Sequence, residues 1–434
     1  MIVDLHWKIL DRVVSISCLL ITQLVFARAL GVAEFGLLGF SSACLALIAP
    51  LSKFGVGGVV TSYLRREPSC EAEILESAIA WRAVGAAISI ILGLTALAYV
   101  EAFSALRGVG ILVVLLQGVS ILAVLDFYFE ARFNSKRLVQ CRIALVSILT
   151  GVKILAAIVY ARADIVLLLQ SIETALLSLA SLRLYRKLEG ARGTSPSIRH
   201  SHWVKTLGAS IPWVLGAGVA EAVYLKIDVV ILSAYSGIAS VGAYVLASKI
   251  SEAVYFLPLV AASSIFPYIN KRNSQIRVVR LRRFLTLFAM AGIFCALGAS
   301  LIGYLLIPAL FGAEYLETLD ILLVHVWAMP FVFMRGLVSR WFIEQDVLHL
   351  SFSTTLLAAI LNIALNFALI PHFSGMGAAL ATVISYAATS FGFLFFFPAR
   401  RSLATTALFA FIRCFSPGEY RWFYRWCRQM LRRT

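Results

Sequence analysis

The sequence predicts an all-α integral membrane protein, with about twelve transmembrane helices in two six-helix lobes and both termini in the cytoplasm. Three observations lead to this fold class: an apolar composition, basic residues confined to alternate connections, and an internal repeat. Of the 434 residues, 61% are hydrophobic and 14% are charged, and the mean hydropathy is +0.91. Soluble proteins average about 45–50% apolar and about 25% charged residues, so this composition is typical of a membrane protein.

Apolar stretches long enough to cross a bilayer follow one another along the chain, and each crossing needs about 20 residues. The alternating segments of about ten residues that a transmembrane barrel requires do not dominate. The N-terminal segment leads straight into the first apolar stretch without a small-residue cleavage site, so we expect no cleavable signal peptide. The predicted helices begin near Ile9, Phe35, Ser77, Gly108, Ile143, Ile165, Leu207, Val241, Phe284, Leu319, Phe352 and Gly377.

Connections between the predicted helices alternate between short segments almost free of Lys and Arg and segments rich in both. About thirty of the 38 Lys and Arg residues lie at the N-terminus, in the basic connections or in the C-terminal tail. Because basic loops stay on the cytoplasmic side, this bias places both termini in the cytoplasm. It also accounts for the formal charge of +16 better than nucleic-acid binding does.

The seven cysteines form no Cys-x-x-Cys pair, and most of them lie inside apolar stretches. This arrangement argues against a disulfide framework or a metal site. We therefore expect no cofactor, no metal ion and no catalytic residue.

The chain also contains an internal repeat. The segment "LGVAEFGLLGF" begins at Leu30, and the similar segment "SGIASVGAYVL" begins at Ser236, about 206 residues later. Transporters are often built from such repeats, with the substrate site near the midplane where the repeats meet. The predicted organisation is an N-terminal lobe over residues 1–185, a cytoplasmic linker over 186–205, a C-terminal lobe over 206–399, and a basic, aromatic cytoplasmic tail over 400–434.

The tail mixes Trp, Phe and Tyr with Arg, as in "YRWFYRWCRQMLRRT". That composition favours a helix lying on an anionic membrane surface, and anionic lipids are then its partners. The other interpretation is a weakly ordered tail.

Charged residues inside predicted membrane helices are costly, at roughly 2.5–3.5 kcal/mol each on insertion scales, and they usually face a cavity or a partner. Some charged residues lie nearer the helix ends, where long side chains reach the membrane surface, and for these we expect a structural role: Arg28, Arg82, Asp126, Arg335 and Arg340. The deeper charges are Lys53, Lys153, Glu173, Glu221, Lys226, Asp228, Lys249 and Glu252.

Helix geometry separates the charges of the predicted seventh helix. Lys226 and Asp228 are two residues apart and do not face each other, whereas Asp228 and Glu221 are seven apart and share a face. Counting equal rises from the turn near Gly237 makes Lys249 the expected partner of Asp228. Lys226 is expected to point elsewhere, toward the outer headgroups, which leaves Asp228 as the cavity candidate.

Lys53 comes 12 residues before Arg65, which lies in a basic connection, and this spacing is about 18 Å along a helix. Lys53 is therefore expected near the middle of the membrane. Two interpretations remain open at this point. Lys53 contacts an anionic ligand, or it pairs with a carboxylate on another helix, such as Glu173 or Glu221.

Several segments, taken in order, resemble a known family over almost the whole chain. They are "ARALGVAEFGLLGF", "APLSKFGVGGVVTSYLRR", "DFYFEARFNSKR", "LGASIPWVLGAGVAEAVYLKIDVVIL" and "LNIALNFALIPHFSGMGAALATVISY". The resemblance is to the polysaccharide transporters of the multidrug/oligosaccharidyl-lipid/polysaccharide (MOP) flippase superfamily, and to O-unit flippases in particular. The family often has an acidic residue before Leu-Gly in its second helix, and Lys53 takes that place here.

The resemblance implies a flippase of the cytoplasmic (inner) membrane that moves a polyprenyl-diphosphate-linked oligosaccharide, such as an O-antigen or exopolysaccharide repeat unit, by alternating access. Lys53, with Arg28 or Lys249, would attract the diphosphate or acidic sugars. The candidates for ion coupling are Asp228, Glu221 and Glu252. A polysaccharide polymerase is a possible partner.

Four other functions are compatible with the sequence. An exporter of cationic drugs would need an acidic cavity, whereas Lys53 and Lys249 make this one mixed or cationic. A flippase for peptidoglycan precursor would share the diphosphate chemistry. A membrane glycosyltransferase, polymerase or ligase would need ordered outer loops, and here these are only a few residues long. A scaffold without transport activity is the fourth.

Overall fold

The computed structural model describes residues 2–100, 103, 107–132, 136–189, 202–269, 274–345, 347–398 and 401–414. Throughout these ranges all regular secondary structure is helical, which confirms the predicted all-α class. Nine helices in the described part of the chain are long and apolar enough to cross a membrane. The chain divides into two compact units, Met1–Val230 and Ile231–Thr434, which are described one at a time.

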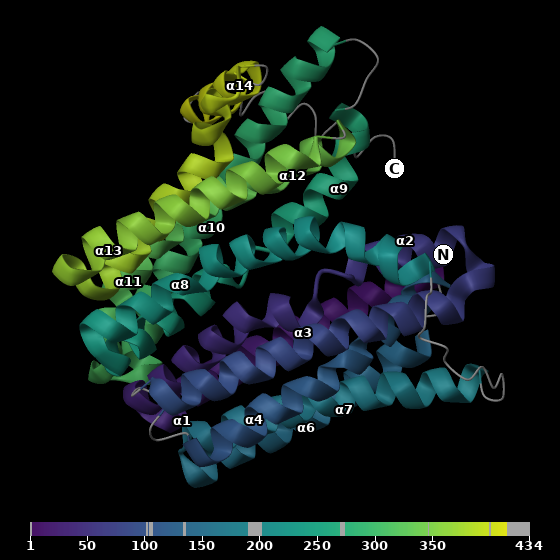
Figure 1. The fold of residues 1–434 in the computed structure, drawn as a ribbon. Helices are drawn as coiled ribbons and strands as arrows, with labels where there is room; N and C mark the ends of the chain where they lie inside the picture. Colours follow the sequence, from purple (N-terminus) through teal and green to yellow (C-terminus); the bar gives the residue numbers. More distant parts are fainter. Residues whose placement is uncertain are drawn as a thin grey trace. The chain divides into compact units, whose positions relative to one another are not determined.

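In the first unit, α1 lies against α3, α6 and α7, and α4 packs between α3 and α7 (Figure 1). A short helix, α2, continues the line of α1 after a break and packs on α3 and α5. The unit ends within the long helix α8. Its helices are α1 (Ile2–Lys53), α2 (Gly57–Arg66), α3 (Glu71–Tyr99), α4 (Arg107–Val119), α5 (Asp126–Ala131), α6 (Lys136–Tyr160), α7 (Ala163–Glu189) and the first part of α8 (His202–Glu252).

In the second unit, α10 packs on α12 and α14, and α13 packs on α11 and α12 (Figure 1). An apolar cluster of this unit joins α9, α10, α12 and α14. After α13 the chain makes a π-helical turn over Ala388–Gly392. The helices after α8 are α9 (Leu257–Ile269), α10 (Ser274–Phe311), α11 (Leu316–His325), α12 (Met329–Glu344), α13 (Leu348–Ala387) and α14 (Arg401–Arg413).

Three of the long helices each contain two predicted membrane spans. In each helix the two spans are separated by one residue whose φ and ψ values are not helical. The breaks fall at Gly31 in α1, Gly237 in α8 and Ser374 in α13. Gly31 has φ 75° and ψ 169°, and Gly237 has φ 82° and ψ 174°. The same unusual backbone conformation therefore recurs at the 206-residue offset of the sequence repeat. The count of twelve crossings and the side on which the termini lie stay predictions.

Replacing Gly31 or Gly237 with alanine is expected to destabilise the protein by about 1–3 kcal/mol each, because this backbone region is nearly closed to residues with a Cβ atom. Thermal unfolding of the purified protein measures the effect. Gly151→Ala is the matched control: a Cβ there meets nothing within 4 Å, and alanine inside a helix is favoured by about 0.5–1 kcal/mol. Equal stability of all three variants would contradict the argument.

Two further interruptions recur in both units. A 3₁₀ segment begins at Ser120 between α4 and α5, and another begins at Val326 between α11 and α12, again 206 residues apart. Likewise α1 ends at Lys53 and α8 ends at Glu252, and each is followed by a few non-helical residues before α2 or α9. Short 3₁₀ stretches within long helices often mark hinges.

The predicted lobe boundaries at residues 185 and 206 stay a prediction. The two compact units are divided at another point, inside α8. Of the predicted tail, α14 is described, and it packs one face of small residues on α10, where the Thr286 hydroxyl donates to the Ala410 carbonyl at 3.2 Å. The Trp- and Arg-rich segment after residue 414 and most of the predicted linker lie outside the described residues.

Candidate functional site

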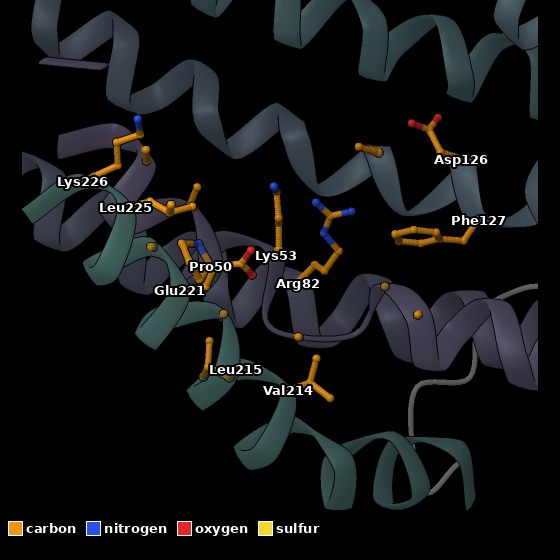
Figure 2. Close-up of a pocket in the computed structure, with 18 residues that line it drawn as sticks. Pro50, Lys53, Arg82, Asp126, Phe127, Val214, Leu215, Glu221, Leu225 and Lys226 are labelled. Atoms are coloured by element: carbon orange, nitrogen blue, oxygen red, sulfur yellow. The ribbon is translucent and has the colours of Figure 1, made fainter. Parts of the chain in front are cut away.

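The first unit contains a cavity with a volume of about 660 Å³. Its wall is largely apolar, with small residues from α1 and α8 and the ring of Phe127, and five charged side chains also line it (Figure 2). The volume lies within the range of about 300–1,000 Å³ that is typical of ligand pockets. The charged residues of the wall are Lys53, Arg82, Asp126, Glu221 and Lys226.

Lys53 is placed by the end of α1. Pro50 lies inside the last turns of this helix, and Phe54 and Gly55 take positive φ values of 49° and 67°, which stop the helix after Lys53. The Phe54 amide still donates to the Pro50 carbonyl at 2.9 Å, so the final turn is closed. The Lys53 side chain is exposed and points into the cavity (Figure 2).

Close packing of α3 on this break brings Arg82 to the same wall. The Phe54 ring stacks on Trp81 with centroids 5.7 Å apart, and a Cβ at Gly85 would lie only 2.2 Å from the Leu51 carbonyl oxygen. Figure 2 shows the Arg82 and Lys53 side chains pointing in the same direction. The expectation that Arg82 reaches the membrane surface is wrong, because the residue is only 4% exposed.

Neither of these two cations is neutralised by an ion pair within the described part of the chain. The Nε atom of Arg82 is also buried without a hydrogen-bond partner there. The alternative interpretation of Lys53 as a partner of Glu173 is excluded, because Glu173 accepts from Lys153 at 2.5 Å. Glu221 lines the same cavity as Lys53 but forms no ion pair with it.

Asp126, by contrast, is held firmly. Its carboxylate accepts from the Arg142 guanidinium at 2.6 Å and from the Ser181 hydroxyl at 2.5 Å. Arg142 also lies 3.3 Å from the Asp11 carboxylate. This network joins α1, α5, α6 and α7, and because it compensates the charge of Asp126, the positive charge of the cavity exceeds the negative.

On α8, Lys226 and Glu221 line the cavity and Asp228 does not. Lys226 and Asp228 thus face different ways, as the spacing predicts, and Lys226 lines this cavity instead of pointing away from it. The coupling role of Asp228 stays a prediction. Asp228 is 5% exposed, and its Oδ1 atom accepts from the Val229 amide at 2.8 Å. Its predicted pairing with Lys249, across the boundary between the two units, stays a prediction.

The remaining predicted site residues lie elsewhere. Arg28 is exposed on α1 and does not line the cavity of the first unit. Lys249 and Glu252 are half-buried at the end of α8 in the second unit. Their predicted roles in binding and coupling stay predictions.

Arg82 is the important residue that the sequence argument missed. It lies 11 residues after the start of α3, or about 16 Å along a helix. The distance along the helix, which was counted for Lys53, would have shown that Arg82 also lies deep in its predicted membrane helix. Chemically, a lysine and an arginine on one wall can bind an anion with at least two oxygen atoms, since guanidinium matches phosphate or carboxylate geometry with paired donors.

With the site described, comparison with known proteins becomes informative. Residues 12–272 match the family described as "Polysaccharide biosynthesis protein", and this match covers more than half of the chain. The chain belongs to the polysaccharide biosynthesis protein family. A relative, the probable flippase AglR of Haloferax volcanii, is 29% identical over an alignment of 182 residues. The match covers 37% of this chain and 35% of AglR. The match thus spans about a third of that relative's length.

Solved structures of transporters share the fold of this chain. The lipid II flippase MurJ in an inward closed conformation superimposes with a TM-score of 0.66 at 16% identity, over 96% of this chain and 92% of MurJ. An inward-facing MATE multidrug transporter of the MOP superfamily gives 0.61 at 13% identity, over 88% and 95% of the two chains. At these identities the likeness concerns the fold. The protein is a multi-pass membrane protein with the fold of MOP transporters.

Proposed function

We propose that this protein flips a polyprenyl-diphosphate-linked oligosaccharide, such as an O-antigen or exopolysaccharide repeat unit, across the cytoplasmic membrane by alternating access. The cationic cavity of the first unit carries the proposal. Lys53 and Arg82 share its wall without an ion pair among the described residues. The family assignment and the relationship to a probable flippase support the same function.

The energetics of charge in a membrane favour a functional role for these two cations. An unpaired charge at the centre of a span costs roughly 2.5–3.5 kcal/mol on insertion scales. Such a cost is tolerated where the charge lines a water-filled cavity or binds a ligand of opposite sign. A diphosphate group is such a ligand, and its oxygen atoms suit both the ammonium group of Lys53 and the guanidinium group of Arg82.

The largely apolar wall around the cations suits the sugar and lipid portions, which need no charge partner. Glu221 lies in the same cavity and remains a candidate for ion coupling, together with Asp228 and Glu252. The protein performs no bond chemistry in this proposal; its two conformations differ in affinity for the cargo. A polysaccharide polymerase would consume the product.

Lys53→Ala is expected to slow translocation on the order of 10- to 100-fold, since a hydrogen bond to a charged group contributes roughly 1.5–3 kcal/mol. The measurement uses vesicles containing the purified protein and a fluorescent lipid-linked oligosaccharide, with transfer followed by accessibility to an added glycosidase. Lys53→Arg should retain most of the activity. Arg12→Ala removes an exposed cation from the same helix and serves as control.

Normal transport by Lys53→Ala at normal protein level would overturn the role of Lys53. The same vesicles distinguish the other functions. Preferential transfer of peptidoglycan precursor assigns the protein to that cargo, and uptake of cationic dyes without lipid transfer assigns it to drug export. A new covalent sugar linkage in the recovered lipid would reveal a glycosyltransferase or polymerase. Absence of every activity would leave the scaffold.

A further inference from the structure

The second unit contains a buried histidine that the cargo cavity does not use. His325 ends α11 and is 1% exposed. Its Nδ1 atom lies 2.5 Å from the Ser251 hydroxyl, which is itself fully buried on α8. The Tyr244 ring meets the imidazole edge to face with centroids 5.9 Å apart. The imidazole is thus fixed in orientation by side chains from a neighbouring helix segment of the same unit.

We infer that His325 is a proton-binding site through which the transport cycle is coupled to protons. This inference rests on the proposed function for its coupling part, whereas proton binding itself concerns the side chain alone. Histidine is the side chain whose ordinary titration falls between pH 5 and 8. Histidines inside membrane helices are rare, and proton relays are among the functional sites that they mark.

The hydrogen bonds of Ser251 define where the proton is held. The Ser251 hydroxyl lies 3.2 Å from the Ser248 carbonyl as well as 2.5 Å from His325 Nδ1. A hydroxyl has one hydrogen atom. When it donates to the Ser248 carbonyl, Nδ1 must carry a hydrogen and donate to Ser251, which leaves Nε2 as the basic nitrogen. In this arrangement Ser251 holds a hydrogen on Nδ1, and Nε2 carries the lone pair that accepts a proton.

Further hydroxyl groups lie on the elements packed around the histidine. The Tyr244 hydroxyl is 3.4 Å from that of Thr382 on α13, and Ser385 follows on the same face of that helix. Thr318 lies on the His325 face of α11, two turns nearer its start. The hydroxyls of Thr318 and Ser385 are fully buried and have no hydrogen-bond partner in the described chain, so they are free to relay a proton.

The titratable groups around His325 come from two elements, α8 and α11. Tyr244 on α8 is in ring contact with it, and Lys249 and Glu252 lie in the same final turns of α8 as Ser251. On α11 itself, Asp320 and Glu317 precede it by five and eight residues, about 7 and 12 Å along the helix. On α13, Thr382 lies next to the Tyr244 hydroxyl, and Ser385 shares its helix face. Both side chains are neutral.

Position explains how protonation could act on the backbone. Immediately after His325 the helix changes to a 3₁₀ segment, Val326–Ala328, and immediately after Ser251 helix α8 ends at Glu252. An imidazolium requires a countercharge, and Glu252 is the carboxylate next to its serine partner. Protonation of His325 would therefore shift the conformational equilibrium of α8 and α11 at the contact between Ser251 and His325.

The proton site is tested directly by nuclear magnetic resonance of the full-length protein in lipid nanodiscs, with ¹⁵N-labelled histidine. His325→Gln assigns the His325 signal by difference, and His325→Asn replaces it should the first variant not fold. A pH series is expected to convert the imidazole signal from its neutral to its protonated form. Ser251→Ala, a change at a positioning residue, should move the midpoint. A His325 signal that keeps one protonation state throughout overturns the proposal.

Coupling is tested in vesicles with an imposed pH difference. One coupled proton and a difference of about one pH unit can change the ratio of cargo between leaflets by up to about tenfold. We expect this response in the wild type and in His372→Gln, which alters an exposed histidine, and its loss in His325→Gln. An unchanged response in His325→Gln overturns the coupling role. Wild-type vesicles that move no lipid-linked oligosaccharide refute the proposed function, while the titration still decides the proton site.

Discussion

Arg82→Met is expected to reduce translocation of lipid-linked oligosaccharide on the order of 10- to 100-fold while leaving stability unchanged or higher. Translocation and stability are expected to change in opposite directions because Arg82 is buried. Arg82 is 4% exposed, and its Nε atom lacks a hydrogen-bond partner within the described structure. Methionine occupies a similar volume without the desolvated charge, so folding should not suffer. A residue that lowers stability but is needed for activity is typical of a binding site.

Two variants complete this experiment. Arg82→Lys retains the charge but loses the planar fork of donors, so we expect intermediate transport. Arg183→Met removes an exposed arginine from α7 and should change neither quantity. Transport and thermal unfolding are measured on the same preparations. A large loss of stability in Arg82→Met with normal transport by the folded fraction would assign Arg82 a structural role instead.

The second large effect concerns the ion pair between α6 and α7. Lys153→Met is expected to destabilise the protein by about 3–5 kcal/mol, because it leaves the Glu173 carboxylate buried without its partner. The Lys153 ammonium and the Glu173 carboxylate are 2.5 Å apart, and their side chains are only 10% and 14% exposed. Thermal unfolding in detergent, followed by tryptophan fluorescence, measures the loss.

The double variant Lys153→Met with Glu173→Met is the matched control. Replacing a buried pair by apolar groups of similar volume is often neutral or stabilising, so the double variant should recover most of the lost stability. Transport should recover with it, because neither residue lines the cavity that contains Lys53. Persistent loss of transport in a stable double variant would contradict this purely structural account.

Backbone features were predictable from the sequence where a local rule dictates them. The repeated glycines at 31 and 237 mark breaks with the same φ and ψ because such a conformation is nearly restricted to glycine. The long apolar stretches predicted the membrane helices because length and composition alone decide them. Pro50 and the glycines after Lys53 are residue types that interrupt helices, and α1 does end there.

The side of a helix that faces the cavity was harder to predict. Spacing showed that Lys226 and Asp228 point apart, but the rotation of α8 about its axis is set by its packing, which one sequence does not reveal. Lys226 therefore turned out to line the cavity and Asp228 did not. Arg82 was judged by its distance from a helix end, yet the contact of Gly85 with the end of α1 encloses it.

The network around Asp126 has a consequence for how cargo preference can evolve. One guanidinium, that of Arg142, connects carboxylates of α1 and α5, and Ser181 of α7 completes the set. A substitution at Asp126 would break the contacts of α5 to both α6 and α7, so this side of the cavity is constrained against change. Glu221, which α8 contributes to the same cavity, forms no ion pair within the described part of the chain. Relatives with a different cargo are therefore expected to differ at Glu221 on α8 before they differ at the Asp126 network.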